Sequence, residues 1–209
     1  MPGVLSPFMS FPPAAGGNTL VGTSYGYGYA PTITVPFPAG AQVGDIAVML
    51  LVSTSGGSGP VPSGWSFGSV GISGAASLYA SKKLTSGDIA TGSVDVSYSS
   101  GSYMLALYRG PTAVAVKAFL ATGYNTPSPM VATGFTKAAG SKSIASIIGS
   151  PTAMYSLSPG APLTSSAGNT AVNLSDINPA SGYANGSDFS YSYSDSNTPT
   201  ILGAIWELS

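Results

Sequence analysis

Hydrophobic and polar residues along this chain form short strand-like segments separated by turn residues. Residues 46–52 are a continuous apolar run, Ile-Ala-Val-Met-Leu-Leu-Val, which predicts a buried strand. Residues 93–98 alternate instead: Val94, Val96 and Tyr98 occupy one face, and Asp95 lies on the other. Such segments recur about every 8 to 12 residues, a spacing typical of β-sandwiches and barrels.

The second half of the chain repeats features of the first at an offset of about 100 residues. Three pairs of segments correspond, in the same order: 46–52 with 143–148, 94–98 with 189–193, and 103–108 with 201–206. A long period seen only twice does not indicate a solenoid. We therefore predict an all-β fold: a single antiparallel β-sandwich, jelly-roll-like, in which two similar halves (about 31–112 and 113–209) form the facing sheets.

Residues 1–30 are rich in Pro and Gly and predict an extended N-terminal arm that crosses a surface or another subunit. Phe8 and Phe11 are unfavourable to leave in water. Tyr25, Tyr27 and Tyr29 alternate with Gly, which in a strand places the three rings on one face. We expect these five aromatic residues to make assembly contacts; a disordered tail is the alternative.

Charge and composition exclude several classes of function. The 209 residues include six Lys or Arg, seven Asp or Glu, no His and no Cys. This composition excludes an imidazole proton shuttle, a thiolate nucleophile and a disulfide. A net charge of −1 without a basic cluster does not suit nucleic acid. We therefore expect no catalytic residues, no cofactor, no metal site and no nucleic-acid partner.

Membrane and export signals are also missing from the sequence. The longest apolar run, residues 46–52, is far shorter than the ~20 residues of a spanning helix. The first residues lack a basic region and contain Pro2 and Pro7, unlike a signal peptide. We expect no membrane insertion.

Several short motifs follow one another in the first half: Pro38-Ala-Gly-x-x-x-Gly-Asp45, Pro62-x-Gly-Trp65, Leu78-Tyr79 with the Gly87-Asp88 turn, and Ala106-Leu-Tyr-Arg-Gly110. In this order and spacing they resemble β-sandwich modules of tailed-phage virion proteins, which also occur in prophage tail regions and some bacterial surface proteins. The resemblance covers about residues 30–112, and the second half lacks a visible Pro-x-Gly-Trp element. It implies a particle or surface component that works by binding.

Individual residues of these motifs have a structural interpretation and, as an alternative, a role in binding. Asp45 and Asp88 follow Gly in turns, where a carboxylate accepts backbone N–H groups; the alternative is a calcium ligand. Arg109 is expected to pair with a carboxylate or carbonyl at the sandwich end, or else to contact a receptor anion. Trp65 is expected to fill space between the sheets, with a sugar-stacking platform as the alternative.

Tyrosine is the leading candidate for recognition, because twelve Tyr among many Ser and Gly are typical of adaptable binding surfaces. Tyr183, Tyr191 and Tyr193 are candidates for a patch. Three interpretations stay open: core, since Phe189 shares a strand face with two of them; an interface with a neighbouring subunit; or a glycan site.

Together these patterns lead to the hypothesis of a non-enzymatic structural protein of a tailed-phage virion, decorating the outside of the head or tail. Made in the host cytoplasm without a signal peptide, it would reside in the virion, contact other virion proteins and form a homo-oligomer, a trimer or dimer. One alternative is a receptor-binding fibre or tail-tip domain that recognises a host surface glycan. Another is a polysaccharide-degrading enzyme with a pair of carboxylates.

Overall fold

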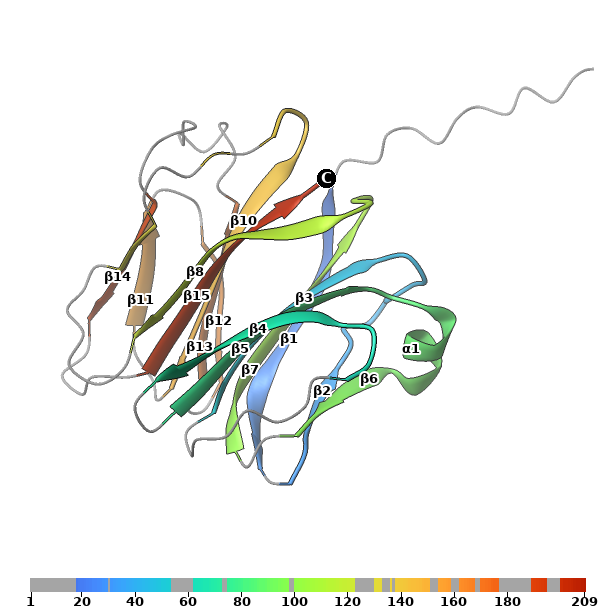
Figure 1. The fold of residues 1–209 in the computed structure, drawn as a ribbon, viewed down its shortest axis with the longest axis horizontal. Helices are drawn as coiled ribbons and strands as arrows, with labels where there is room; N and C mark the ends of the chain where they lie inside the picture. Colours follow the sequence, from blue (N-terminus) through green and yellow to red (C-terminus); the bar gives the residue numbers. More distant parts are fainter. Residues whose placement is uncertain are drawn as a thin grey trace, which may run out of the picture.

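A computed structural model of the chain describes residues 18–29, 31–53, 62–72, 75–97, 100–122, 130–132, 136, 138–150, 154–158, 162–167, 170–176, 189–194 and 200–209. Within these ranges the protein is almost entirely antiparallel β-sheet (Figure 1), which confirms the predicted all-β fold.

The first half of the chain forms a large and a small sheet. The large sheet has five strands, in spatial order β1 (Thr19–Tyr29), β7 (Ser100–Arg109), β3 (Ile46–Ser53), β5 (Ala75–Lys83) and β4 (Ser66–Ile72). The small sheet pairs β2 (Ile33–Pro36) with β6 (Ser93–Val96). A short helix, α1 (Ser86–Thr91), lies between β5 and β6 along the chain.

The second half repeats this arrangement. Its large sheet has five strands, in spatial order β8 (Val114–Thr122), β15 (Thr200–Leu208), β10 (Lys142–Ser150), β13 (Thr170–Asp176) and β12 (Pro162–Ala167). Its small sheet has the order β9 (Met130–Ala132), β14 (Phe189–Ser194) and β11 (Met154–Ser158).

The two halves have the same strand order, with β11 as an addition in the second. In each half the last strand along the chain (β7 or β15) lies between the first strand (β1 or β8) and the third strand (β3 or β10) of that half. The chain crosses between the large and small sheets in a jelly-roll-like way. The three correspondences predicted from sequence are therefore confirmed as β3 with β10, β6 with β14, and β7 with β15.

The register of the strands matches as well. Ile46 lies opposite Tyr108 in the first large sheet, and Ile144 lies opposite Trp206 in the second, so both members of the pair are displaced by 98 positions. Next to these residues each first strand is irregular: β1 skips Val21 and β8 skips one residue at the equivalent point. A shared bulge position is a detailed likeness, since bulges are specific features of a fold.

The two large sheets pack face to face, and the small sheets cover their outer faces, giving four layers (Figure 1). Apolar residues between the large sheets form what we call the central core: Ile46, Val48, Leu50, Val52, Met104, Ala106, Tyr108, Ile144, Leu202, Ala204, Trp206 and Leu208. A second cluster, the outer core, lies between the first large sheet and β2–β6. Its residues include Ile33, Val35, Met49, Leu51, Trp65, Leu78, Val94, Val96, Leu105 and Leu107. Because β3 contributes to both cores, it is apolar at every position from Ile46 to Val52.

Contacts between the halves follow an approximate two-fold relation. β3 contacts β10 and β15, and β10 contacts β3 and β7, their equivalents. Likewise β7 contacts β13, and β15 contacts β5. The halves therefore associate like the two subunits of an isologous dimer, within a single chain.

The N-terminal arm predicted for residues 1–30 is corrected for its second part. Residues 19–29 form β1, which pairs with β7 from Thr19 to Tyr29. The Tyr-Gly alternation explains this: Tyr25 packs on the central core, whereas at Gly26, on the opposite face, a Cβ would collide with Tyr103. A small residue is thus required there for close packing within the sheet. Residues 1–17, with Phe8 and Phe11, lie outside the described residues.

Candidate functional site at the ends of the central strands

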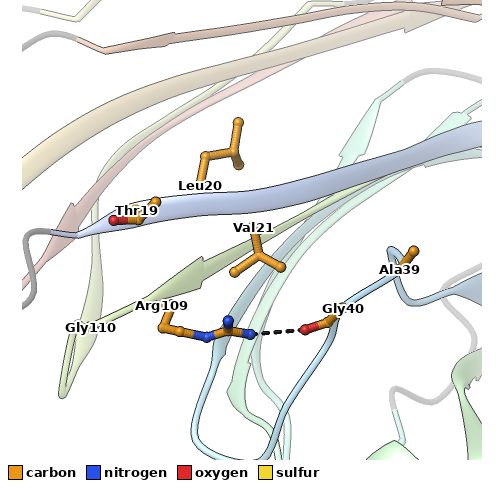
Figure 2. A pocket seen from close by; sticks show the side chains of 7 residues that line it. All are labelled: Thr19, Leu20, Val21, Ala39, Gly40, Arg109 and Gly110. Atoms are coloured by element: carbon orange, nitrogen blue, oxygen red, sulfur yellow. Dashed lines mark hydrogen bonds between the residues drawn. The ribbon is translucent and has the colours of Figure 1, made fainter.

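A pocket of about 490 Å³ lies where β1 begins and β7 ends. It is lined by Thr19, Leu20, Val21, Ala39, Gly40, Arg109 and Gly110 (Figure 2). The antiparallel register places Thr19 opposite Arg109, and the turn before β3 closes the other side. The pocket therefore lies between the start of β1 and the end of β7, the first and last strands of the first half.

Arg109 is the charged residue of this pocket. Its Nε donates to Asp45 Oδ1 and its Nη2 to Asp45 Oδ2, both at 2.9 Å, and Nη2 also donates to the Gly40 carbonyl at 2.8 Å (Figure 2 shows the bond to Gly40). These bonds to the carboxylate raise the pKa of Arg109 above its ordinary value. Asp45 is only 2% exposed and also accepts the Gln42 N–H at 2.8 Å. The predicted pairing of Arg109 and the turn role of Asp45 are both confirmed.

The chemistry available to the pocket follows from this geometry. Leu20, Val21 and Ala39 supply apolar walls, and the guanidinium is fixed in place with its charge compensated by Asp45. Such a site suits a group with an apolar body and a hydrogen-bond acceptor at its tip. In the part of the chain that the structure describes, no three Asp or Glu side chains gather as metal ligands. No helix within the same ranges is long and apolar enough to span a membrane.

The second half has an equivalent of the turn that borders this pocket. The Ala41 N–H donates to Pro38 O at 3.3 Å, and the Ser141 N–H donates to Ala138 O at the same distance. The third residue of each turn is glycine with positive φ, 87° at Gly40 and 80° at its counterpart, as a type II turn requires. The local backbone of the site is thus present twice.

The charge at the end of the last strand has the opposite sign in the second half. Glu207 occupies the position that Arg109 has in the first half, and Ser143 replaces Asp45. The cation is now Lys117, the residue that β8 skips, whose Nζ lies 2.9 Å from Glu207 Oε2. Its counterpart in β1 is the uncharged Val21. In each half the charged residue that follows position 108 or 206 of the last strand thus has an ion-pair partner, and the two partners come from different positions.

Two opposing effects act on Glu207. Burial raises its pKa, but bonds from Lys117, from the Ala138 backbone N–H and from Ser141 outweigh burial and hold the pKa below its ordinary value of 4.5. The Ala138 N–H lies 3.2 Å from Glu207 Oε1. Glu207 is therefore a carboxylate stabilised in its ionised form, as expected for a structural ion pair.

Asp88 has a structural role in a helix rather than in the predicted turn. Thr85 and Asp88 form a capping box at the start of α1: the Thr85 N–H donates to Asp88 Oδ2 at 2.7 Å, and the Asp88 N–H donates to Thr85 Oγ1 at 3.4 Å. Lys82 Nζ completes the site at 2.7 Å from Asp88 Oδ1. Burial raises the pKa of Asp88, but the bonds from Lys82 and Thr85 lower it by a larger amount. The net change in the pKa is therefore downward.

The aromatic residues that the sequence suggested for binding lie in different parts of the fold. Trp65 is 7% exposed and belongs to the outer core, as the structural interpretation predicted, so its ring offers no open face to a sugar. Tyr191 and Tyr193 lie on β14, where they pair with Leu157 and Tyr155. Tyr183 lies outside the described residues, and the patch stays a prediction.

Sequence reasoning missed two residues, Asn18 and Lys142, whose bonds fasten the start of β1 to the second half. The Asn18 side-chain Nδ2 donates to the Leu208 carbonyl at 3.0 Å, and Lys142 Nζ donates to the Asn18 carbonyl at 3.2 Å. These contacts join residues more than a hundred positions apart, so no local motif signals them. Glu207 was detectable through its offset of 98 from Arg109.

Comparisons with protein-family models, with curated proteins and with solved structures gave no match to this chain. The resemblance to virion modules therefore rests on the sequence motifs alone.

Proposed function

We propose that this chain is a non-enzymatic structural protein of a tailed-phage virion, carried on the outside of the head or tail. The observation that carries the proposal is the anchorage of Asn18, the residue that joins residues 1–17 to the sandwich. Asn18 is bonded to Leu208 and Lys142 of the second half, and the strand after it is paired along its length with β7.

This anchorage suits a domain that is held on a larger particle by its N-terminal segment. A force applied through residues 1–17 reaches β1, whose ladder with β7 lies beside β3 in the middle of the sheet. Phe8 and Phe11 provide the apolar groups that a binding segment needs in order to bury surface on a partner. The sandwich itself would remain outside as the displayed part.

The composition supports the same proposal. The chain has a net charge of −1. Many of its charged side chains also form ion pairs within the chain: Arg109–Asp45, Lys117–Glu207 and Lys82–Asp88. A surface with few free charges resists close packing of neighbouring copies only weakly. This property is useful in a component that is repeated on a particle.

Copy number in purified particles tests the proposal. Quantitative mass spectrometry, calibrated against the most abundant particle protein, is expected to find the chain in hundreds of copies for a head or tail-tube decoration. A few to a few tens of copies would instead favour the receptor-binding alternative. Absence from the particle would overturn the proposal.

A variant of the full chain tests the role of the N-terminal segment. Phe8→Ser combined with Phe11→Ser is expected to abolish incorporation into particles and to leave the thermal unfolding of the isolated protein unchanged. Val43→Ser is the matched control, because Val43 is 63% exposed in a turn outside that segment. Equal incorporation of both variants would contradict attachment through residues 1–17.

A further inference from the structure

Within the ranges that the structure describes, four strands border the two large sheets: β1, β4, β8 and β12. An edge strand presents unpaired N–H and C=O groups, and proteins usually protect such edges by bulges, charges or proline. β1 and β8 are irregular in register, β8 also carries Lys117, and β12 begins at Pro162. Three of the four edges therefore have a feature that hinders pairing with another chain.

β4 lacks all of these features. Its seven residues, Ser-Phe-Gly-Ser-Val-Gly-Ile, include no charge and no proline, and they pair with β5 in an unbroken register. Among the described residues β4 has hydrogen-bonded pairing on the β5 side alone. Its outer edge is thus a regular template for an additional strand.

Phe67 of β4 is one of two large hydrophobic side chains exposed among the described residues, at 59%, the other being Val43. Phe67 lies opposite Ala80, which is part of the outer core, so its ring is on the outer-core face of the sheet. It continues the apolar outer-core face onto β4, the last strand of the sheet. An added strand would cover it.

We propose that β4 pairs with β4 of a second copy of this chain, antiparallel about a two-fold axis at Ser69, so that the two first large sheets become one continuous sheet. The sequence of β4 fits this register. With Ser69 at the axis, Phe67 of one copy lies opposite Gly71 of the other, on the same face of the sheet. A cross-strand aromatic residue beside glycine is a favourable pair, because the ring covers the backbone that glycine leaves open.

Charge does not oppose this association. β4 is uncharged, and Lys82 on the neighbouring strand is paired with Asp88 at 2.7 Å. With a net charge of −1 per chain, two copies repel each other little. The inference goes beyond the proposed function and does not depend on it.

The mass of the full-length protein in solution gives the first test. Light scattering after gel filtration is expected to show twice the chain mass of 20.7 kDa, falling to the single-chain mass in Phe67→Lys. Val43→Lys, the same change at the other exposed hydrophobic residue, is expected to keep the dimer. Circular dichroism verifies that both variants are folded.

Cysteine cross-linking tests the register and does not depend on the behaviour of Phe67→Lys. The chain has no Cys, so Ser69→Cys introduces a single thiol. Across the two-fold axis the two Cα atoms would lie about 4.5 to 5.5 Å apart, within the range of a disulfide. Copper-phenanthroline oxidation, which removes two electrons and two protons from the thiol pair, is expected to cross-link this variant fully. In Ser66→Cys the thiols would lie about 20 Å apart, six residues along the strand, and stay reduced.

A dimer lost in Phe67→Lys and cross-linked through residue 69 supports the proposal. A monomeric wild-type protein at all concentrations, a dimer unaffected by Phe67→Lys, or cross-linking of Ser66→Cys in preference to Ser69→Cys would each overturn it.

Discussion

Trp206 donates its indole N–H to the Oγ of Ser146 at 2.7 Å, between two side chains that are both fully buried. In the first half the equivalent residues are Tyr108 and Val48. A buried indole needs an acceptor, and the second half supplies one at a position that is apolar in the first. The halves therefore share the same backbone arrangement but differ in the side chains at this pair of central positions.

Ser146→Ala is expected to destabilise the protein by about 1 to 3 kcal/mol, the cost of a buried donor without its acceptor. Chemical denaturation measures the change. In a Trp206→Phe background the same substitution should cost clearly less, since no indole N–H is left to satisfy. Equal costs in both backgrounds would mean that the hydrogen bond does not contribute.

Glu207 makes stability depend on pH. Burial raises its pKa, but its bonds to Lys117, Ala138 and Ser141 lower it below 4.5 in the folded protein. Its contribution is therefore present in full above pH 4.5, the ordinary value, and is lost as pH falls through the lower, folded value. Between pH 5 and 3 the free energy of unfolding should fall more steeply for the wild type than for Glu207→Gln. Asp88, whose pKa is also lowered, contributes to the slope of both proteins, so parallel curves would exclude a contribution from Glu207.

Much of the fold was predictable because the strands of the two cores are apolar in distinctive ways. Residues 46–52 face two cores, so the apolar run is continuous, whereas β6 faces one core and alternates between Val94, Asp95 and Val96. The same two patterns recur about 100 residues later, which revealed the two halves. The small sheets on the outer faces were not foreseen as separate layers, because sequence patterns do not tell which strands share a sheet.

The site was predictable only in part. Asp45 and Arg109 belong to motifs at a turn and a strand end, where a compensating partner is expected. Lys117 offered no such signal, since its contact with Glu207 depends on the bulge in β8. The N-terminal boundary was misplaced because glycines usually weaken a strand, whereas those of β1 are needed where neighbouring side chains approach closely.

Helix α1 provides a local test of capping. Thr85→Ala removes the acceptor for the Asp88 N–H and one hydroxyl partner of the Asp88 carboxylate. The expected loss is about 1 kcal/mol, the usual value for an N-cap threonine, and Thr85→Ser should retain most of it. Urea denaturation of the three proteins distinguishes the outcomes. A loss equal for Ala and Ser would point to the threonine methyl group instead of the cap.

Gly68 controls how the two halves meet on the β4 side of the sandwich. A Cβ at this position would overlap the Tyr79 ring, which packs against Phe119 of the second half with ring centroids 4.4 Å apart and lies 6.2 Å from the Trp206 ring. Gly68→Ala should therefore push Tyr79 away from Phe119 and destabilise the protein by about 1 to 3 kcal/mol, as overpacking does. In a Tyr79→Leu background, where no ring crosses β4, the same Ala should be nearly neutral. Because this double-mutant comparison separates the collision from any intrinsic effect of Ala in the strand, an equal loss in both backgrounds would show that Gly68 is not needed for the contact between the halves.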